Sequence, residues 1–272
     1  MAIDVLERTG LTPLAFRTHE LIRRFDLRAM RRNRAYASGI GPDGLPLPPP
    51  RLITLVAGDP DIGWFLESSR TFADSLDAML SRNGLELSQF GTILDFGCGV
   101  GRLIRTFSGM QDVRLLGTDY NPELIGWCRE NLPFAEFSVN DLAPPLDYAD
   151  DSVDFVYAFS VFTHLPENLQ RQWITELHRI LRPGGYLLIT TQGDSYLGIM
   201  TESERARYHS GNLVVRSESG AGTNRCAAFH PETYLRTDLL DAFKIVEHAA
   251  VSRNETGGVL QDMVLAKLDE HA

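Results

Sequence analysis

The 272-residue sequence is poor in cysteine and lacks long apolar runs, and each shortage excludes a class of protein. Its three cysteines, Cys98, Cys128 and Cys226, are too few and too scattered for a disulfide framework or a zinc site. We therefore expect reduced thiols and no bound metal. No stretch is long enough to cross a bilayer, and the first residues contain no apolar run typical of a secretory signal. We expect a cytoplasmic protein without a membrane span.

Positive charge is also scarce, with 26 lysines and arginines against 36 acidic residues and a formal net charge of −10. A field of this sign disfavours nucleic acids and anionic membranes, so small-molecule ligands are favoured. Arginines nevertheless gather on one face of a helix predicted over residues 14–36, namely Arg17, Arg23, Arg24, Arg28, Arg31, Arg32 and Arg34. We interpret them as a solvated face that pairs with acidic residues; a docking surface for an anionic substrate or partner is the second interpretation.

A glycine-rich turn between two apolar runs is the most informative feature that the sequence contains. Residues 93–96 predict a short buried strand, the glycines at 97, 99 and 101 allow a tight turn, and residues 100–108 predict a helix. A ligand can then lie against bare backbone and a helix N-terminus. The second apolar run ends at Asp119, which predicts a carboxylate at the tip of the next parallel strand, where it can accept ribose hydroxyl protons.

The spacing of this turn differs from that of a dinucleotide-binding loop. The glycines read G-x-G-x-G instead of G-x-G-x-x-G, and Asp95 precedes them. An acid at that position repels a pyrophosphate and suits a ligand that carries an ammonium and a sulfonium group. These features point to S-adenosyl-L-methionine as the ligand.

Short apolar runs alternate with helical patterns through the rest of the chain. This order predicts an α/β fold with a doubly wound, mostly parallel sheet. We expect strands at 93–96, 113–118, 135–138, 153–159 and 185–191, and helices at 100–108, 121–131 and 166–181. A helix over 231–243 and two final strands, 244–251 and 261–268, joined around 254–258, complete the pattern.

Two segments fall outside this alternation. Residues 1–89 predict an N-terminal helical extension, in which the proline-rich stretch 39–50 forms a linker or lid and a helix follows over about 65–80. Residues 90–272 then form the ligand-binding domain. Within it, an irregular segment at about 193–230, with a short helix near 202–208, predicts an insertion over the site.

Motifs in this order resemble the class I S-adenosylmethionine-dependent methyltransferases over about residues 90–268. The matching motifs are Asp95-Phe96-Gly97-Cys98-Gly99-Val100-Gly101, Gly117-Thr118-Asp119-Tyr120, Asn140-Asp141-Leu142, Asp154-Phe155-Val156-Tyr157 and Leu181-Arg182-Pro183-Gly184-Gly185. The resemblance implies a seven-stranded Rossmann-like sheet that ends in an antiparallel hairpin, with S-adenosyl-L-methionine as the cofactor. It implies little about the acceptor.

The resemblance also assigns candidate residues to the cofactor. Asp95 meets the methionine amino end, Asp119 the ribose, and Tyr120, Asp141 and Leu142 the adenine. The full candidate set is Asp95, Gly97, Cys98, Gly99, Gly101, Arg102, Asp119, Tyr120, Asn140, Asp141, Leu142, Phe159 and Ser160. We interpret Cys98 as a small loop residue, because no histidine near it in sequence would activate its thiol.

Candidate catalytic residues follow the fourth strand or lie in the insertion. His164 is the leading base, since imidazole titrates near neutral pH. A capping or packing role is the alternative for it. His230 and Tyr196 are further candidates for reaching the acceptor, with His209 as a weaker one. Each of these is also compatible with an ordinary hydrogen-bonded loop residue.

We expect a methyltransferase that acts on a small molecule, with a hydroxyl oxygen as the methyl acceptor. A nitrogen acceptor stays open, although Phe159-Ser160-Val161-Phe162 stands where a nucleobase or amide N-methyltransferase has an Asn-Pro-Pro-Tyr-like tetrapeptide. Three competing hypotheses are a cofactor-binding regulatory or scaffold protein without turnover, an RNA-modifying enzyme that uses the arginine face, and a nicotinamide oxidoreductase. A homodimer is compatible with the sequence.

Overall fold

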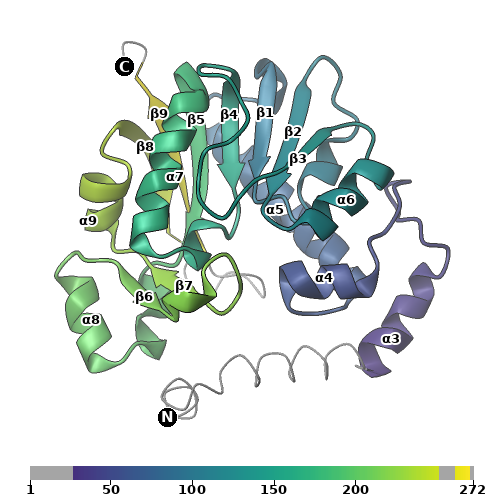
Figure 1. Ribbon diagram of the computed structural model, residues 1–272, viewed down its shortest axis with the longest axis horizontal. Coiled ribbons are helices and arrows are strands. Elements are labelled where there is room, and N and C mark those ends of the chain that lie inside the picture. Colours follow the sequence, from purple (N-terminus) through teal and green to yellow (C-terminus); the bar gives the residue numbers. More distant parts are fainter. Residues whose placement is uncertain (1–26, 251–260, 270–272) are drawn as a thin grey trace.

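The computed structural model describes residues 27–250 and 261–269, and these residues form a three-layer α/β structure (Figure 1). Its seven-stranded sheet has the order β3-β2-β1-β4-β5-β9-β8, and only β9 runs antiparallel to its neighbours. The strands are β1 Thr92–Phe96, β2 Arg114–Asp119, β3 Glu136–Val139, β4 Val153–Ala158, β5 Leu181–Thr191, β8 Phe243–Ala249 and β9 Asp262–Leu268. The predicted fold and its final hairpin are confirmed.

Helices cover both faces of the sheet, which explains why β1 is buried along its whole length. One face packs against α7 (Glu167–Ile180) and the short α9 (Glu232–Tyr234) with its π-helical continuation Leu235–Leu239. The other packs against α5 (Ile62–Arg82) and α6 (Pro122–Asn131). Figure 1 shows α7 in front of the sheet and α5 behind it.

The two predicted appendages to the sheet are both present in the described residues. Before β1 come α3 (Leu27–Asn33), a 3₁₀ helix at Arg34–Tyr36, and α4 (Pro50–Ala57). After β5 come a 3₁₀ helix at Asp194–Ile199, α8 (Glu202–His209) and the hairpin of β6 (Val214–Arg216) and β7 (Ala227–Phe229). Figure 1 places α4 and this insertion at the same end of the sheet. Both lie beside the carboxyl ends of β1 and β4, after which the chain continues on opposite faces of the sheet.

Four local predictions need correction. The helix expected over 100–108 is a series of turns that ends in a 3₁₀ helix, Ile104–Phe107. The expected linker ends in a helix, because Pro50 is the first residue of α4, where its missing N–H costs nothing. The helix over 231–243 is shorter than expected and turns into a π-helix, and β5 begins at Leu181 because its first residue pairs with Val153.

The predicted arginine face is only partly visible, since Arg17, Arg23 and Arg24 lie outside the described residues. Arg32 forms an ion pair with Asp61, with 2.5 Å between Nε and Oδ2. This contact agrees with the interpretation that the arginines pair with nearby acids. Within residues 27–250 and 261–269, no helix combines the length and the apolar character that crossing a membrane requires.

Candidate functional site

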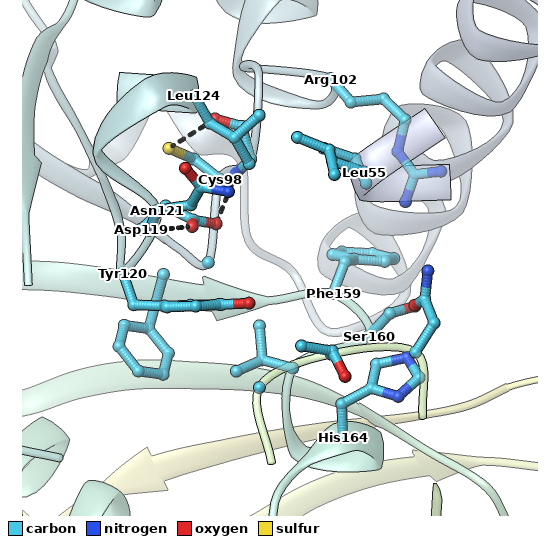
Figure 2. A pocket seen from close by; sticks show the side chains of 18 of the residues that line it. Leu55, Cys98, Arg102, Asp119, Tyr120, Asn121, Leu124, Phe159, Ser160 and His164 are labelled. Carbon is cyan, nitrogen blue, oxygen red and sulfur yellow. Dashed lines mark hydrogen bonds between the residues drawn. The ribbon is translucent and has the colours of Figure 1, made fainter. Parts of the chain in front are cut away.

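A cavity of about 590 Å³ lies at the carboxyl ends of β1, β2 and β4, at the point where the strand order reverses. This is where open α/β sheets bind ligands, and the volume suits a small molecule with its cofactor. Every predicted cofactor residue except Gly101 lines the cavity, and so does His164. Figure 2 shows Asp119 and Tyr120 on one side of it, and Phe159, Ser160 and His164 on the other.

The glycine turn shapes one wall of the cavity by keeping side chains out. Gly97 has φ +78°, and a Cβ there would lie 2.4 Å from Val161 Cγ2. Gly99 has φ +57°, and a Cβ there would lie 2.8 Å from Val56 Cγ2 in α4. Gly101 faces away from the cavity, where a Cβ would meet Leu132 at 2.5 Å, so its role is packing.

The turn's N–H groups are largely committed within the protein. Gly97 and Cys98 both donate to Thr118 O, at 2.8 and 3.0 Å, and Gly99 donates to Asp119 Oδ2 at 3.0 Å. Because residues 100–108 form turns and a 3₁₀ helix, no α-helix N-terminus directly follows the turn. This corrects the expected anion-binding geometry and agrees with a cationic ligand.

Asp119 ends β2 with its carboxylate held in place. Its Oδ2 accepts from Gly99 N, its Oδ1 accepts from Asn121 N at 2.9 Å, and only 8% of the residue is exposed. Burial raises the pKa of this carboxyl, while the two backbone hydrogen bonds work in the opposite direction. An ionised carboxylate has about four acceptor positions, so each oxygen can still accept one hydroxyl proton.

Asp95 is the second acid of the cavity, and it lacks a partner for one of its oxygens. Its Oδ2 is buried and accepts no hydrogen bond from the described residues. Burial raises the pKa of Asp95 to about 7; Asp119 adds to the rise, while Tyr157 and Arg102 oppose it. A buried carboxylate oxygen without a donor favours a ligand that brings one, such as an ammonium group.

Arg102 supplies a cation near Asp95. Its guanidinium packs against two rings of α5, with Cζ 4.8 Å from the Phe72 centroid and 5.7 Å from the Trp64 centroid. Burial lowers the pKa of Arg102 to about 10, and the charge of Asp95 opposes that change. Arg102 is therefore charged at neutral pH. Asp95 and Arg102 together complement a zwitterion.

The insertion closes the part of the cavity that lies beside Tyr120. Gly222 has φ +75°, and a Cβ there would lie 2.8 Å from Leu142 and 3.3 Å from Tyr120. Asn140 does not reach freely into the cavity, because Thr118 Oγ1 donates to its Oδ1 at 2.7 Å and its Nδ2 donates to Asp141 O at 2.7 Å. Tyr120, Asp141 and Leu142 all line the cavity.

His164 stands in a short 3₁₀ helix, Phe162–His164, and its tautomer is set by a backbone carbonyl. Its Nδ1 lies 2.7 Å from Cys226 O, so Nδ1 carries the proton and Nε2 has a free lone pair. Burial lowers the pKa of His164, against the effect of the Cys226 hydrogen bond. Gly222 N also donates to His164 O at 2.8 Å. The result is a neutral imidazole at the cavity wall.

Comparisons with known proteins agree with this geometry. Residues 93–185 match the methyltransferase domain family. The 2-methyl-6-phytyl-1,4-hydroquinone methyltransferase of Synechocystis is 31% identical over 137 residues, which cover 48% of this chain and 41% of that protein. Trans-aconitate 2-methyltransferase of Variovorax paradoxus is 31% identical over 106 residues, or 38% and 39% of the two chains. The aligned part thus spans about two fifths of these relatives.

Among solved structures, Burkholderia thailandensis 1,6-didemethyltoxoflavin-N1-methyltransferase has a TM-score of 0.54 at 20% identity, covering 79% of this chain and 84% of that one. These similarities place residues 93–185 in the methyltransferase domain family. S-adenosyl-L-methionine is the cofactor that these similarities indicate, and the unpartnered Asp95 oxygen and the side-chain-free glycine turn fit it.

Two of the predicted catalytic residues do not line the cavity. His230 is 1% exposed, its Nε2 lies 3.2 Å from Gln170 Oε1, and burial lowers its pKa to about 3. Tyr196 packs against the Phe229 ring, with 5.7 Å between centroids. The weaker candidate His209 is exposed at the end of α8. The insertion holds these side chains away from the cavity, so we do not retain them.

The sequence did not indicate several residues that line the cavity. Residues 55–57 come from the unpredicted α4, residues 222–225 from the insertion, and Gln261 from the start of the last hairpin strand. Pro50 followed by an apolar run was a usable signal for α4. No local pattern marks Gln261, because only the pairing of β5 with β9 brings it to the site.

Proposed function

We propose that this protein is an S-adenosylmethionine-dependent methyltransferase that transfers the methyl group to a hydroxyl oxygen of a small-molecule acceptor, with His164 as the general base. The observation that carries the proposal is the hydrogen bond from His164 Nδ1 to Cys226 O, which leaves Nε2 as a proton acceptor at the cavity. A hydroxyl is a weak nucleophile that becomes a strong one as its proton is removed, whereas a neutral amine is already nucleophilic without a base. A neutral, oriented base therefore favours oxygen over nitrogen.

The chain's residues would hold the cofactor along the cavity wall. Asp119 would accept the ribose hydroxyl protons, Asp95 would pair with the ammonium group, and Arg102 would pair with the carboxylate. Tyr120 and Leu142 would contact the adenine. When bound, S-adenosyl-L-methionine supplies an electrophilic methyl carbon, which leaves while its bonding electrons stay on sulfur.

The protein's own contribution is orientation, exclusion of water and proton removal. The acceptor oxygen is positioned opposite the methyl group by the side of the cavity that bears Phe159 and His164, and its proton moves to His164 Nε2. Positioning of this kind supplies much of the acceleration of a displacement reaction. Residues 222–225 and α4 contribute the walls that limit access of water to the cavity.

Calorimetry tests the cofactor site directly. S-adenosylmethionine and S-adenosylhomocysteine should bind the purified protein, and NAD should not. Asp119→Ala should weaken binding of both by roughly 1 to 3 kcal/mol, the scale for losing a buried hydrogen-bond partner. Asp147→Ala, at an exposed position, is the matched control and should bind like the unchanged protein.

Turnover separates the enzyme from a scaffold. Incubation with S-adenosylmethionine and a panel of phenols, alcohols and amines should release S-adenosylhomocysteine with a hydroxyl acceptor. Cofactor binding without release under any acceptor would instead favour a regulatory or scaffold role. Release only with amines would move the acceptor atom to nitrogen.

A further inference from the structure

Three polar groups close a hydrogen-bonded triangle beside the cavity. Ser160 N donates to Thr190 Oγ1 at 2.8 Å, Thr190 Oγ1 donates to Gln261 Oε1 at 2.6 Å, and Ser160 Oγ donates to Gln261 Oε1 at 2.9 Å. Thr190 is 2% exposed and Gln261 is 9% exposed. The triangle joins the loop after β4 to β5 and to the residue before β9.

The triangle fixes which end of the Gln261 amide faces the cavity. Oε1 receives two protons, which fill both of its lone pairs. Reversing the amide would leave the two hydroxyl protons without an acceptor among the described residues. Nε2 is therefore the end turned away from the triangle, and it has no partner within residues 27–250 and 261–269. Since Gln261 lines the cavity, it presents N–H donors there.

Backbone strain at Ser160 supports a functional role for this arrangement. Ser160 has φ +57°, a conformation that residues other than glycine rarely adopt. Such strain persists where the surroundings determine it, and it concentrates at functional sites. Both the N–H and the hydroxyl of Ser160 take part in the triangle, so the strained residue orients Gln261.

The neighbouring wall is aromatic. The rings of Phe72 and Phe159 lie 5.1 Å apart between centroids, at an interplanar angle of 39°, and both line the cavity. Figure 2 shows Phe159, Ser160 and His164 on one side, away from Asp119 and Tyr120. A donor from Gln261, an acceptor from His164 and a flat apolar wall thus surround the acceptor's part of the cavity.

We infer that the acceptor is a flat ring carrying the reacting hydroxyl next to a second oxygen, and that Gln261 Nε2 donates to that second oxygen. This inference rests on the proposed function. The hydroxyl oxygen forms the new bond to the methyl carbon as its proton moves to His164 Nε2, and the electrons of the broken methyl–sulfur bond remain on sulfur. Gln261 is then a specificity residue, and Thr190 positions it.

Two isomeric probes test the inference, because 2-methoxyphenol has the second oxygen next to its hydroxyl and 4-methoxyphenol has it across the ring. We expect kcat/KM for the 2-isomer to exceed that for the 4-isomer by about 10-fold, the scale of one hydrogen bond to the substrate. Gln261→Leu should bring the ratio close to one. Gln172→Leu, at an exposed position of α7, should keep it.

The second series tests the triangle itself. Thr190→Val should lower the isomer ratio and Thr190→Ser should restore it, with thermal unfolding showing that each variant is folded. S-adenosylmethionine affinity should be unchanged in all variants. Equal turnover of the isomers, turnover of neither, or an unchanged ratio in Gln261→Leu would overturn the inference while cofactor binding still supports the proposed function. Loss of cofactor binding in the unchanged protein would instead reject the proposed function.

Discussion

Asp95 and Arg102 place opposite charges at one end of the cavity, and the structure shows no ion pair between them within the described residues. Each is held by its surroundings instead, Asp95 in the centre of the sheet and Arg102 against two rings of α5. Buried charges without partners destabilise a protein. We therefore infer that these two residues serve ligand binding and lower the stability of the free protein.

The raised pKa of Asp95 predicts a pH dependence of cofactor affinity. Burial raises this pKa to about 7, so Asp95 ionises between about pH 6 and pH 8 and only then pairs with an ammonium group. Calorimetry should show tighter S-adenosylmethionine binding at pH 8 than at pH 6. Asp95→Asn should bind more weakly and lose the pH dependence; a slope retained in this variant would assign the titration to another group.

The same group has the opposite effect on stability. A carboxyl whose folded pKa is about 7, against about 3.9 in the unfolded chain, stabilises the fold below about pH 4, and this contribution is lost as pH rises through 7. In the absence of cofactor, Asp95→Asn should therefore unfold at a higher temperature than the unchanged protein at pH 8, with a smaller difference at pH 5. Thermal unfolding at the two pH values measures this, and a difference that does not grow with pH would contradict it.

His164→Ala should lower the methyl-transfer rate by about 10²- to 10⁴-fold, the usual contribution of a general base, with nearly unchanged cofactor affinity. Because burial lowers the pKa of His164 below 6.5, the unchanged enzyme should lose activity only at acidic pH. His209→Ala, outside the cavity, is the matched control. A rate unaffected by His164→Ala at every pH would make the residue a packing group.

Elements outside the sequence motifs complete the site. The turn before α4 is held by Arg105, which is 1% exposed and donates to Asp43 and to Pro46 O. Burial acts to raise the pKa of Asp43, but the hydrogen bonds and charge of Arg105 outweigh it and leave that pKa lowered. This ion pair anchors the proline-rich segment to the 3₁₀ helix that follows the glycine turn.

Removing the carboxylate of this pair should lower the free energy of unfolding more than replacing the buried arginine with an apolar side chain. Asp43→Ala leaves Arg105 buried and unpaired and should lower the free energy of unfolding by about 3 kcal/mol, whereas Arg105→Met should cost less. Urea denaturation measures both. Glu136→Ala, which breaks the exposed Arg114 pair, is the control and should cost at most about 1 kcal/mol. Equal losses for Asp43→Ala and Glu136→Ala would show that the anchor contributes no more than a surface pair.

At this scale the sequence predicted elements best where periodicity and end signals agree. α5 has an apolar stripe, the N-cap Asp61 and a glycine after its end, and β1 has a fully buried run, so both lie close to their expected positions. The sequence 100–108 has apolar residues at helical spacing too. The positive-φ glycines that lead into it and the Arg105 anchor hold it in turns, which local propensity does not reveal.

For the whole molecule, the ordered motifs were sufficient to predict the sheet and to bring Asp95 and Asp119 to one cavity. Asp95 and Asp119 lie at the ends of neighbouring strands, so strand order alone brings them together. The side of the cavity that bears His164 and Gln261 was less predictable because its residues are far apart in sequence. Gln261 reaches Ser160 only through the pairing of β9 with β5 and of β5 with β4, and no local pattern encodes those pairings.

One short stretch of the insertion touches both halves of the site. Gly222 packs on Tyr120 and Leu142 and donates to His164 O, and Cys226 O accepts from His164 Nδ1. Substitutions that move this backbone would alter the protonated nitrogen of the imidazole as well as the packing on Tyr120 and Leu142. New acceptor specificities should therefore evolve in this scaffold by changes at α4 and around Gln261, while the backbone at 222–226 is retained.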